Sequence, residues 1–236
     1  TLSVNDTIFV AKGTYQPSKD STSFRLNNFF LTILGGFPSG GGTLAERSWQ
    51  NDSTILLGRM NSVIALDAAF IFSTIDGFYI TGGDAEIGGG INTNIAGRNY
   101  TIQNCVFYNN KSRIWSGGGI INYGNDVKLI NVLFKQNKNF GGTGGGALDN
   151  RGNNLFLLNV DFIENANVDT TFAAGGAFIN EGDNVHLQNV IFKGNTASAD
   201  SGSVFGGALR NLGDNMLLQN VQFENNTATS AFGNVF

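Results

Sequence analysis

The chain has very few of the residues on which several other architectures depend. Its 236 residues include 2 prolines, 2 tryptophans, 1 histidine and a single cysteine, Cys105. One cysteine excludes an internal disulfide framework. Related segments of the chain have valine at the position of Cys105, so we expect a buried apolar side chain rather than a reactive thiol. No stretch approaches the roughly 20 apolar residues of a membrane-spanning helix.

Charge is also scarce. Asp, Glu, Lys and Arg make up 14% of the residues, and the net charge is −4. Because the sequence has no basic stripe that could neutralise phosphates, nucleic acid is not an expected partner. Glycine, with 33 residues, is abundant instead, and so is asparagine. Both residues tolerate positive φ, so the composition favours many tight turns between short strands.

One pattern occurs five times between Gly88 and Asn226. It contains two glycines with a small residue, an asparagine, a turn of Gly with Asn or Asp, and then Asn-Val-x-Phe-x-x-Asn, with Cys105 replacing the valine in the first unit. A period of this length is typical of stacked supersecondary units. The phenylalanines follow one another after 27, 28, 30 and 31 residues: Phe107, Phe134, Phe162, Phe192 and Phe223.

Each unit predicts one coil of a β-helix. Apolar residues alternate on both sides of an asparagine, as in Leu155 and Leu157 before Asn159 and Val160 and Phe162 after it. The alternation slips by one residue at the asparagine, which predicts two short strands that meet at a corner. The corner asparagines are Asn104, Asn131, Asn159, Asn189 and Asn220.

A third short strand is predicted after each Gly-Gly pair, and it leads to a second column of asparagines. Three strands and three corners per unit favour an all-β fold, a right-handed parallel β-helix, because antiparallel hairpins would not return the same corner residue in the same phase. Equivalent side chains then stack about 4.8 Å apart, so we expect a phenylalanine ladder and asparagine ladders. The second column is Asn94, Asn122, Asn150, Asn180 and Asn211.

The chain divides into two parts by regularity. Residues 1–74 are expected to form irregular leading coils and an N-terminal cap, and residues 75–236 the regular repeats of one continuous solenoid, as a fragment of a longer chain. Asp76 is predicted to lie in the column of corner asparagines. The segment after Phe-x-x-Asn lengthens from 111–116 to 196–205. Such insertions predict a ridge of loops at one corner.

Two resemblances follow from these motifs. Residues 75–236, with Gly-Gly-Ala-Leu at 145–148 and 206–209 and five Phe-x-x-Asn elements, resemble the repeats of bacterial polymorphic outer membrane proteins. Residues 8–58, with Ile-Phe-Val-Ala-Lys-Gly-Thr-Tyr and Thr-Ile-Leu-Leu-Gly, are similar to the opening coils of exported β-helix surface proteins of Bacteroidota. The resemblance implies an extracellular or cell-surface location in a bacterium and an adhesive or structural role.

No catalytic, cofactor-binding or metal-binding residues are predicted. A β-helix polysaccharide lyase or hydrolase would need convergent carboxylates. Asp183 and Asp214 are stacked at the Gly-Asn/Asp turn, but asparagines share their column, so a turn-capping ladder explains them. Arg151 and Glu181 are expected to form an exposed pair of little energetic weight, and His186 a solvated side chain. The acidic residues of one coil have no counterparts in neighbouring units: Asp149, Asp161 and Glu164.

Apolar residues at outward positions of two coils predict a contact surface. Either this face packs against another copy or another domain, or the corner loops cover it. The residues are Ile130, Leu133, Phe156, Leu158 and Ile163. A cell-surface glycan is a further possible partner, and Trp115 and Tyr123 are the aromatic candidates for it.

From the sequence we therefore expect a non-enzymatic extracellular or cell-surface β-helix that acts as a stalk, an adhesin segment or a filament subunit. The alternatives are a polysaccharide lyase or hydrolase and a glycan-binding module on the same fold.

Overall fold

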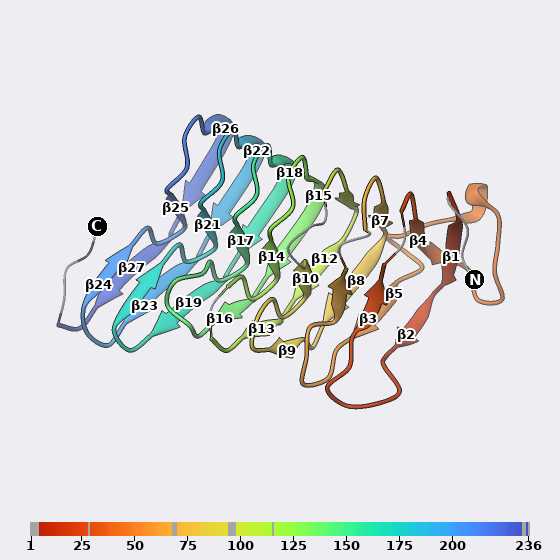
Figure 1. Cartoon of the computed structure of the whole chain (residues 1–236), viewed down its shortest axis with the longest axis horizontal. Coiled ribbons are helices and arrows are strands. Elements are labelled where there is room, and N and C mark those ends of the chain that lie inside the picture. Colours follow the sequence, from red (N-terminus) through yellow and green to blue (C-terminus); the bar gives the residue numbers. More distant parts are fainter. Residues whose placement is uncertain are drawn as a thin grey trace.

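The protein is a right-handed parallel β-helix of about 7 turns, as the sequence predicts (Figure 1). The computed structural model describes residues 5–27, 29–67, 70–93, 98–114, 116–232 and 235. Every strand pairing among these residues is parallel. The one helical element there is the 3-10 turn η1 (Leu44–Glu46).

The strands form four sheets that run along the helix axis. Sheet 1 has 12 strands: β1 (Thr7–Ala11), β2 (Gly13–Tyr15), β4 (Thr32–Phe37), β5 (Thr54–Leu57), β7 (Thr74–Asp76), β8 (Phe78–Thr81), β11 (Thr101–Gln103), β12 (Val106–Tyr108), β15 (Lys128–Lys135), β18 (Phe156–Ile163), β22 (His186–Lys193) and β26 (Leu217–Glu224). Sheet 2 has 7 strands: β3 (Phe24–Leu26), β6 (Ile64–Leu66), β10 (Ile91–Thr93), β14 (Ile120–Asn122), β17 (Leu148–Asn150), β21 (Phe178–Asn180) and β25 (Leu209–Asn211).

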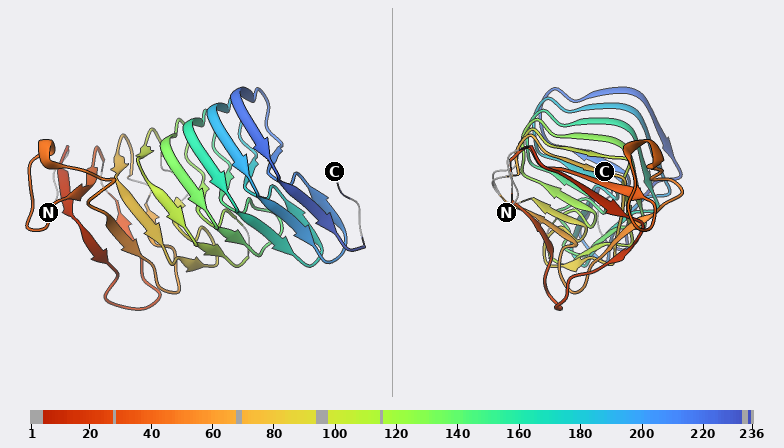
Figure 2. Two further views of the ribbon diagram at one scale, coloured as in Figure 1. Left: turned by 180° about the vertical axis from the view of Figure 1, so that it is seen from behind. Right: turned by 90° about the vertical axis from the view of Figure 1, so that its right-hand side faces the viewer.

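The other two sheets are shorter. Sheet 3 has 6 strands: β9 (Asp84–Ala85), β13 (Lys111–Ser112), β16 (Lys138–Asn139), β19 (Ala166–Asp169), β23 (Thr196–Ala199) and β27 (Thr227–Ser230). Sheet 4 has 2 strands, β20 (Phe172–Ala174) and β24 (Ser203–Phe205). Seen along the axis, the sheets enclose the interior of the coil (Figure 2).

The corner predicted at the first asparagine column is a bend within one strand. In β15 and β18, eight residues each, the strand continues through Asn131 and Asn159, which have φ of 53° and 54°. A single residue in the left-handed region changes which side chains point inward, and this explains the phase slip of the apolar pattern. Two of the three predicted strands are therefore the arms of one bent strand, because the ladder of hydrogen bonds to neighbouring coils continues across the bend.

The phenylalanine ladder is confirmed. The rings of Phe134 and Phe162 have centroids 5.0 Å apart and planes 5° apart, and Phe162 and Phe192 are 4.8 Å apart. Phe107 continues the stack at one end and Phe223 at the other, each 4.9 Å from its neighbour. The first four rings are fully buried, whereas Phe223 in the last coil is 50% exposed.

The asparagine ladders are also confirmed. In the first column, from Asn131 onward, the amide of each asparagine donates to the asparagine of the preceding coil, for example Asn159 Nδ2 to Asn131 Oδ1 at 2.9 Å. In the second column Asn150 Nδ2 donates to Asn180 Oδ1 at 2.6 Å. Asn94 of that column lies outside the described residues. A third, buried ladder joins the asparagines that end each Phe-x-x-Asn element: Asn110, Asn137, Asn165, Asn195 and Asn226.

The lengthened segments form strands rather than a ridge of loops. In residues 166–174 and 196–205 the chain runs out along sheet 3 and returns along sheet 4. The two sheets pack through small side chains, Ala173 and Val204 against Ala197 and Ala199, all of them buried. We call this two-layered extension the fin. It forms because alternating small apolar residues allow two short strands to pack closely.

Asp76 lies one residue away from its predicted register. Its backbone pairs with Gln103, and Gly77, with φ of 83°, precedes the corner asparagines in their column. The carboxylate of Asp76 nevertheless accepts a hydrogen bond from Asn104 Nδ2 at 2.8 Å, so it ends that ladder. The corner needs positive φ, and glycine provides it where the repeat has not yet begun.

Candidate binding surface and the groups considered for chemistry

The predicted apolar contact residues lie together on the outer face of sheet 1. All of them are half-buried, and they come from β15 and β18, which pair with one another. Ile130 is in register with Leu158, and Leu133 and Ile163 lie on the second arms of these strands. We call this surface the apolar face; it consists of Ile130, Leu133, Phe156, Leu158 and Ile163.

This surface continues toward the N-terminal coils through residues that were not predicted to belong to it. Tyr79 of β8 and Val106 of β12 are in register with Leu133, so the three side chains form one outward column. Tyr108 lies next to them, with its ring centroid 5.9 Å from that of Tyr79. The constant spacing of 27 residues between these three column positions is a signal that could have identified them.

Few charges interrupt the apolar face. Asp161 lies between Leu133 and Ile191 in the outward column. Burial raises the pKa of the Asp161 carboxyl. Lys128 and Lys135 lie in register with Phe156 and with Ile163. The face is therefore mainly apolar, with charged groups at separate positions.

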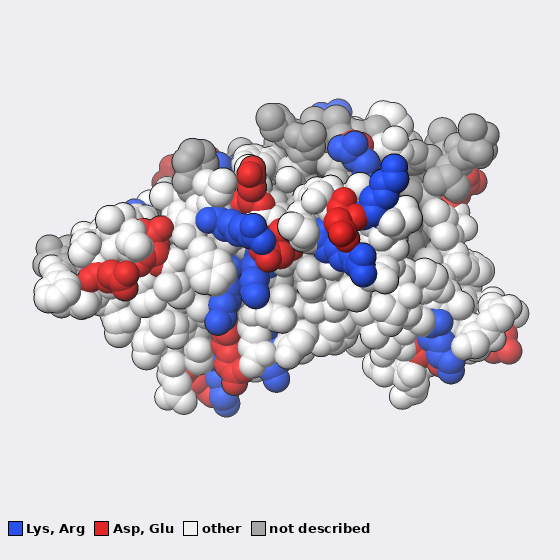
Figure 3. Space-filling model, turned by 90° about the horizontal axis from the view of Figure 1, so that it is seen from below, with Lys and Arg blue, Asp and Glu red and all other residues white. Residues whose placement is uncertain are grey.

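Several exposed charges elsewhere lie close to charges of opposite sign. Seen from below the view of Figure 1, Lys and Arg side chains lie beside Asp and Glu side chains, and most of the surface between them is uncharged (Figure 3). Arg113 Nε lies 2.7 Å from Asp84 Oδ1, and Lys193 Nζ lies 2.9 Å from Glu224 Oε2. Exposed pairs of this kind contribute little to stability.

The stacked aspartates form a turn-capping ladder, as the sequence indicates. The backbone N–H of Asp214 donates to Asp183 Oδ1 at 2.8 Å, and the N–H of Asp183 donates to Asn153 Oδ1 at the same distance. Each side chain thus accepts from the backbone of the next coil. Within the described ranges, no three His, Cys, Asp or Glu side chains are grouped as a metal site would require.

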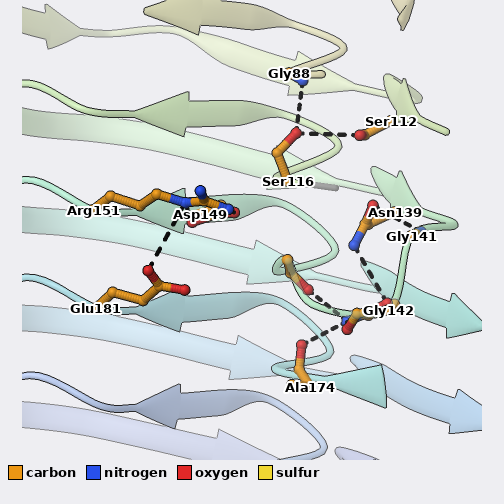
Figure 4. A network of polar contacts seen from close by, with 12 residues as sticks. Gly88, Ser112, Ser116, Asn139, Gly141, Gly142, Asp149, Arg151, Ala174 and Glu181 are labelled. Atoms are coloured by element: carbon orange, nitrogen blue, oxygen red, sulfur yellow. Dashed lines mark hydrogen bonds and ion pairs between the residues drawn. The ribbon is translucent and has the colours of Figure 1, made fainter. Parts of the chain in front are cut away.

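Arg151 has a partner, Asp149, that the sequence did not predict. Its guanidinium lies 3.2 Å from the Asp149 carboxylate, which is fully buried, and 4.0 Å from Glu181 (Figure 4). The same guanidinium lies 5.4 Å from the ring centroid of Tyr123. Asp149 faces outward from sheet 2, yet burial raises its pKa to about 6, while Arg151 acts in the opposite direction. The predicted Arg151–Glu181 pair is present, but Asp149 is closer to the guanidinium.

The raised pKa of Asp149 predicts a pH-dependent stability. An acid with a higher pKa in the folded chain binds its proton more tightly there, so its stabilising contribution is complete below about pH 4 and is lost as the pH rises to about 6. Between pH 4 and pH 7 the wild-type chain should lose about 2 kcal/mol relative to the Asp149→Asn variant. Urea denaturation at both pH values measures the difference. The exposed Asp214→Asn variant is the control, and an equal pH response of the two variants would contradict the prediction.

The remaining candidates are not brought into a common site. His186 is half-buried rather than solvated: its Nε2 atom is buried without a hydrogen-bond partner among the described residues, and its ring lies 5.2 Å from that of Phe156. Trp115 lies outside the described residues. Glu164 accepts from Gln136 in a turn. Cys105 is buried, as expected, and burial raises its pKa to about 12.

The described part of the chain includes no helix with the length and apolar character to cross a membrane. No protein-family model matches the chain, and no curated protein or solved structure matches it.

Proposed function

We propose that this chain is a segment of an extracellular or cell-surface β-helix with a structural or adhesive role, in a stalk, an adhesin or a filament. The observation that supports the proposal is the unbroken stacking of side chains along the axis. The phenylalanine ladder and the three asparagine ladders connect each regular coil to the next, with rings about 5 Å apart and amide hydrogen bonds of 2.6–3.1 Å.

Such stacking produces a rod. Each coil contacts only its neighbours, so length and stiffness increase with the number of coils, while the outward side chains can vary without disturbing the interior. A rod of this kind suits a protein that spans a distance and presents a surface. Its extracellular placement rests on the resemblance of the Gly-Gly-Ala and Phe-x-x-Asn repeats to polymorphic outer membrane proteins.

The apolar face is the surface proposed for assembly. Half-buried isoleucine, leucine and phenylalanine side chains on a solvent-facing sheet favour contact with another copy of the chain or with a neighbouring domain. The outer faces of two sheets can pack with their side chains interdigitated, as sheets do within sandwiches.

Replacing Phe156 by serine should weaken self-association at least about tenfold, because large aromatic side chains carry much of the energy of apolar interfaces. Sedimentation velocity over a range of concentrations measures the effect. Phe140→Ser is a matched control, because Phe140 is 44% exposed and follows β16, away from sheet 1. An unchanged assembly state in the Phe156→Ser variant would remove the apolar face from the proposal.

The function itself is tested in the source cells. Antibodies against the purified chain should label the outside of intact cells in immunogold electron microscopy, on fibres or at the end of stalks. Label confined to the cell interior, or depolymerisation of a uronate polymer by the purified chain, contradicts a structural or adhesive role.

A further inference from the structure

The segment that connects β4 and β5 forms one wall of a groove on the outer face of sheet 1. This segment, residues 38–53, contains η1 and projects outside the cross-section of the coil (orange in Figure 2). The groove has a volume of about 290 Å³ and reaches from Trp49 to β8 and β12. Its lining includes Trp49, Gln50, Ser53, Tyr79, Asn104 and Val106.

Trp49 is held in place by its neighbours in the chain. The Arg47 guanidinium forms two hydrogen bonds with the Asp76 carboxylate, at 2.6 and 3.1 Å, and a third with Gly35 O at 2.7 Å. The N–H of Ser48 donates to Gly36 O at 2.8 Å. A Cβ at Gly36 would lie 2.5 Å from the Cα of Trp49, so the segment lies directly on the backbone of sheet 1. These contacts fix the backbone at Trp49, and this lowers the entropy cost of presenting its side chain to a ligand.

Several polar groups around the groove have no hydrogen-bond partner among the described residues. They are the indole N–H of Trp49, the side-chain amide of Gln50, the Ser53 hydroxyl and the Tyr79 phenol. By contrast, the amide of Asn104 bonds to Asp76 and to Asn131. The free groups can both donate and accept hydrogen bonds.

The lining carries no formal charge at neutral pH. None of its residues is Asp, Glu, Lys, Arg or His, and burial raises the pKa of the Tyr79 phenol, which therefore stays protonated. An ionic ligand would lose water in this groove without gaining a counter-charge. A pyranose ring offers an apolar C–H face that can lie on an aromatic ring and hydroxyls around its edge that pair with neutral donors and acceptors.

We propose that the groove between Trp49 and Tyr79 binds an uncharged pyranose chain. The proposal rests on the adhesive role proposed above and names the class of ligand. Tyr79, Val106 and Leu133 stand in one column along the axis, about 4.8 Å apart. An extended oligosaccharide that leaves the groove along the axis therefore meets a new side chain at every coil and continues toward the apolar face.

The experiment uses the full chain with Trp115→Phe, which leaves Trp49 as the only indole because the sequence has 2 tryptophans. Cellohexaose, laminarihexaose and mannohexaose are titrated, with hexagalacturonate as the charged comparator, and Trp49 fluorescence and heat are recorded. At least one uncharged oligosaccharide should bind saturably, and hexagalacturonate should not. In the wild-type background, Trp49→Ala should weaken binding at least about tenfold, the scale of one lost aromatic contact.

A second variant avoids any effect on folding. Gln50 and Ser53 are exposed and their side chains form no hydrogen bond in the described structure, so Gln50→Ala with Ser53→Ala should leave the melting temperature unchanged and weaken binding about threefold or more. Phe140→Ser, at an exposed position that follows β16 and lies away from sheet 1, should leave oligosaccharide binding unchanged.

Three results would overturn the proposal: no binding of any uncharged oligosaccharide, equal binding by the Trp49→Ala variant, or loss of a dimer on Trp49→Ala, which would make a second copy the occupant. Cell-surface label without oligosaccharide binding contradicts the groove alone. Label confined to the cell interior contradicts the proposed function, whatever the groove binds.

Discussion

Replacing Phe162 by alanine should lower the free energy of unfolding by about 3–5 kcal/mol. Its fully buried ring lies in the middle of the ladder, with stacked neighbours Phe134 and Phe192 on either side and Phe178 6.0 Å away. Alanine removes the buried apolar area and leaves a cavity that rigid neighbouring coils cannot close. The substitution weakens the packing of this coil against both neighbouring coils, because each coil is stabilised by its contacts with the next. Urea denaturation followed by far-UV circular dichroism measures it.

Phe223→Ala is the matched control. Phe223 belongs to the same column and stacks on Phe192 at 4.9 Å, but it is 50% exposed. Its replacement should cost about 1 kcal/mol, since less apolar area is lost and no enclosed cavity forms. Equal losses in the two variants would show that the stacked column is not what stabilises the coils.

Replacing Asn165 by alanine should destabilise the chain by about 3–5 kcal/mol, although asparagine is polar. Its buried Nδ2 donates to Phe134 O and to Asn195 Oδ1, both at 3.0 Å. Its Oδ1 accepts from the backbone N–H and the amide of Asn137, at 2.9 and 3.0 Å. Alanine leaves these groups buried and without the hydrogen bonds that water would otherwise supply, and this is the main cost.

The control for Asn165 is Asn159→Gly. Asn159 donates to Asn131 Oδ1 in an equivalent ladder, but it is exposed and has φ of 54°. Glycine removes the amide and adopts the same backbone conformation without strain, and water replaces the lost bond, so the cost should stay below about 1 kcal/mol. A loss in Asn159→Gly as large as that in Asn165→Ala would contradict the role assigned to burial. Denaturation curves and hydrogen exchange of the neighbouring coils compare the two.

The interior columns could be predicted because the sequence repeats. A side chain such as Phe162 or Asn159 recurs at the same place in each unit, and stacking a repeated backbone brings equivalent residues together. The apolar face follows from the same logic, since Ile130 and Leu158 are neighbours once the register is known. Tyr79 and Val106 could have been added by extending that register by one more period.

Prediction fails where the period is lost. Asp76 lies one residue out of its expected register because the leading coils have glycine, not asparagine, at the corner. The fin was interpreted as loops because its segments differ in length, whereas the alternating alanines Ala197 and Ala199 pack against the returning strand. When segments differ in length, the repeat does not determine which of their residues are in register. Their strand pairing then depends on the strands that lie beside them in the folded chain.

The polar groups considered for chemistry also divide into contacts that follow from the repeat and contacts that do not. The turn ladder of Asp183 and Asp214 follows from their column, while the bond between Asp149 and Arg151 depends on side-chain directions at the end of β17. The Trp49 groove depends on the contact between Arg47 and Asp76, which are 29 residues apart, and Arg47 belongs to no repeat.

By itself, the order of residues determined the coil, its parallel stacking and the side chains that fill it, because a periodic sequence places identical groups one above another. The fin and the groove beside Trp49 became evident only in the folded chain. These features come from contacts between segments that are far apart in the sequence and that do not repeat. The geometry of such contacts depends on backbone conformation and on the space that glycines such as Gly36 and Gly77 leave open.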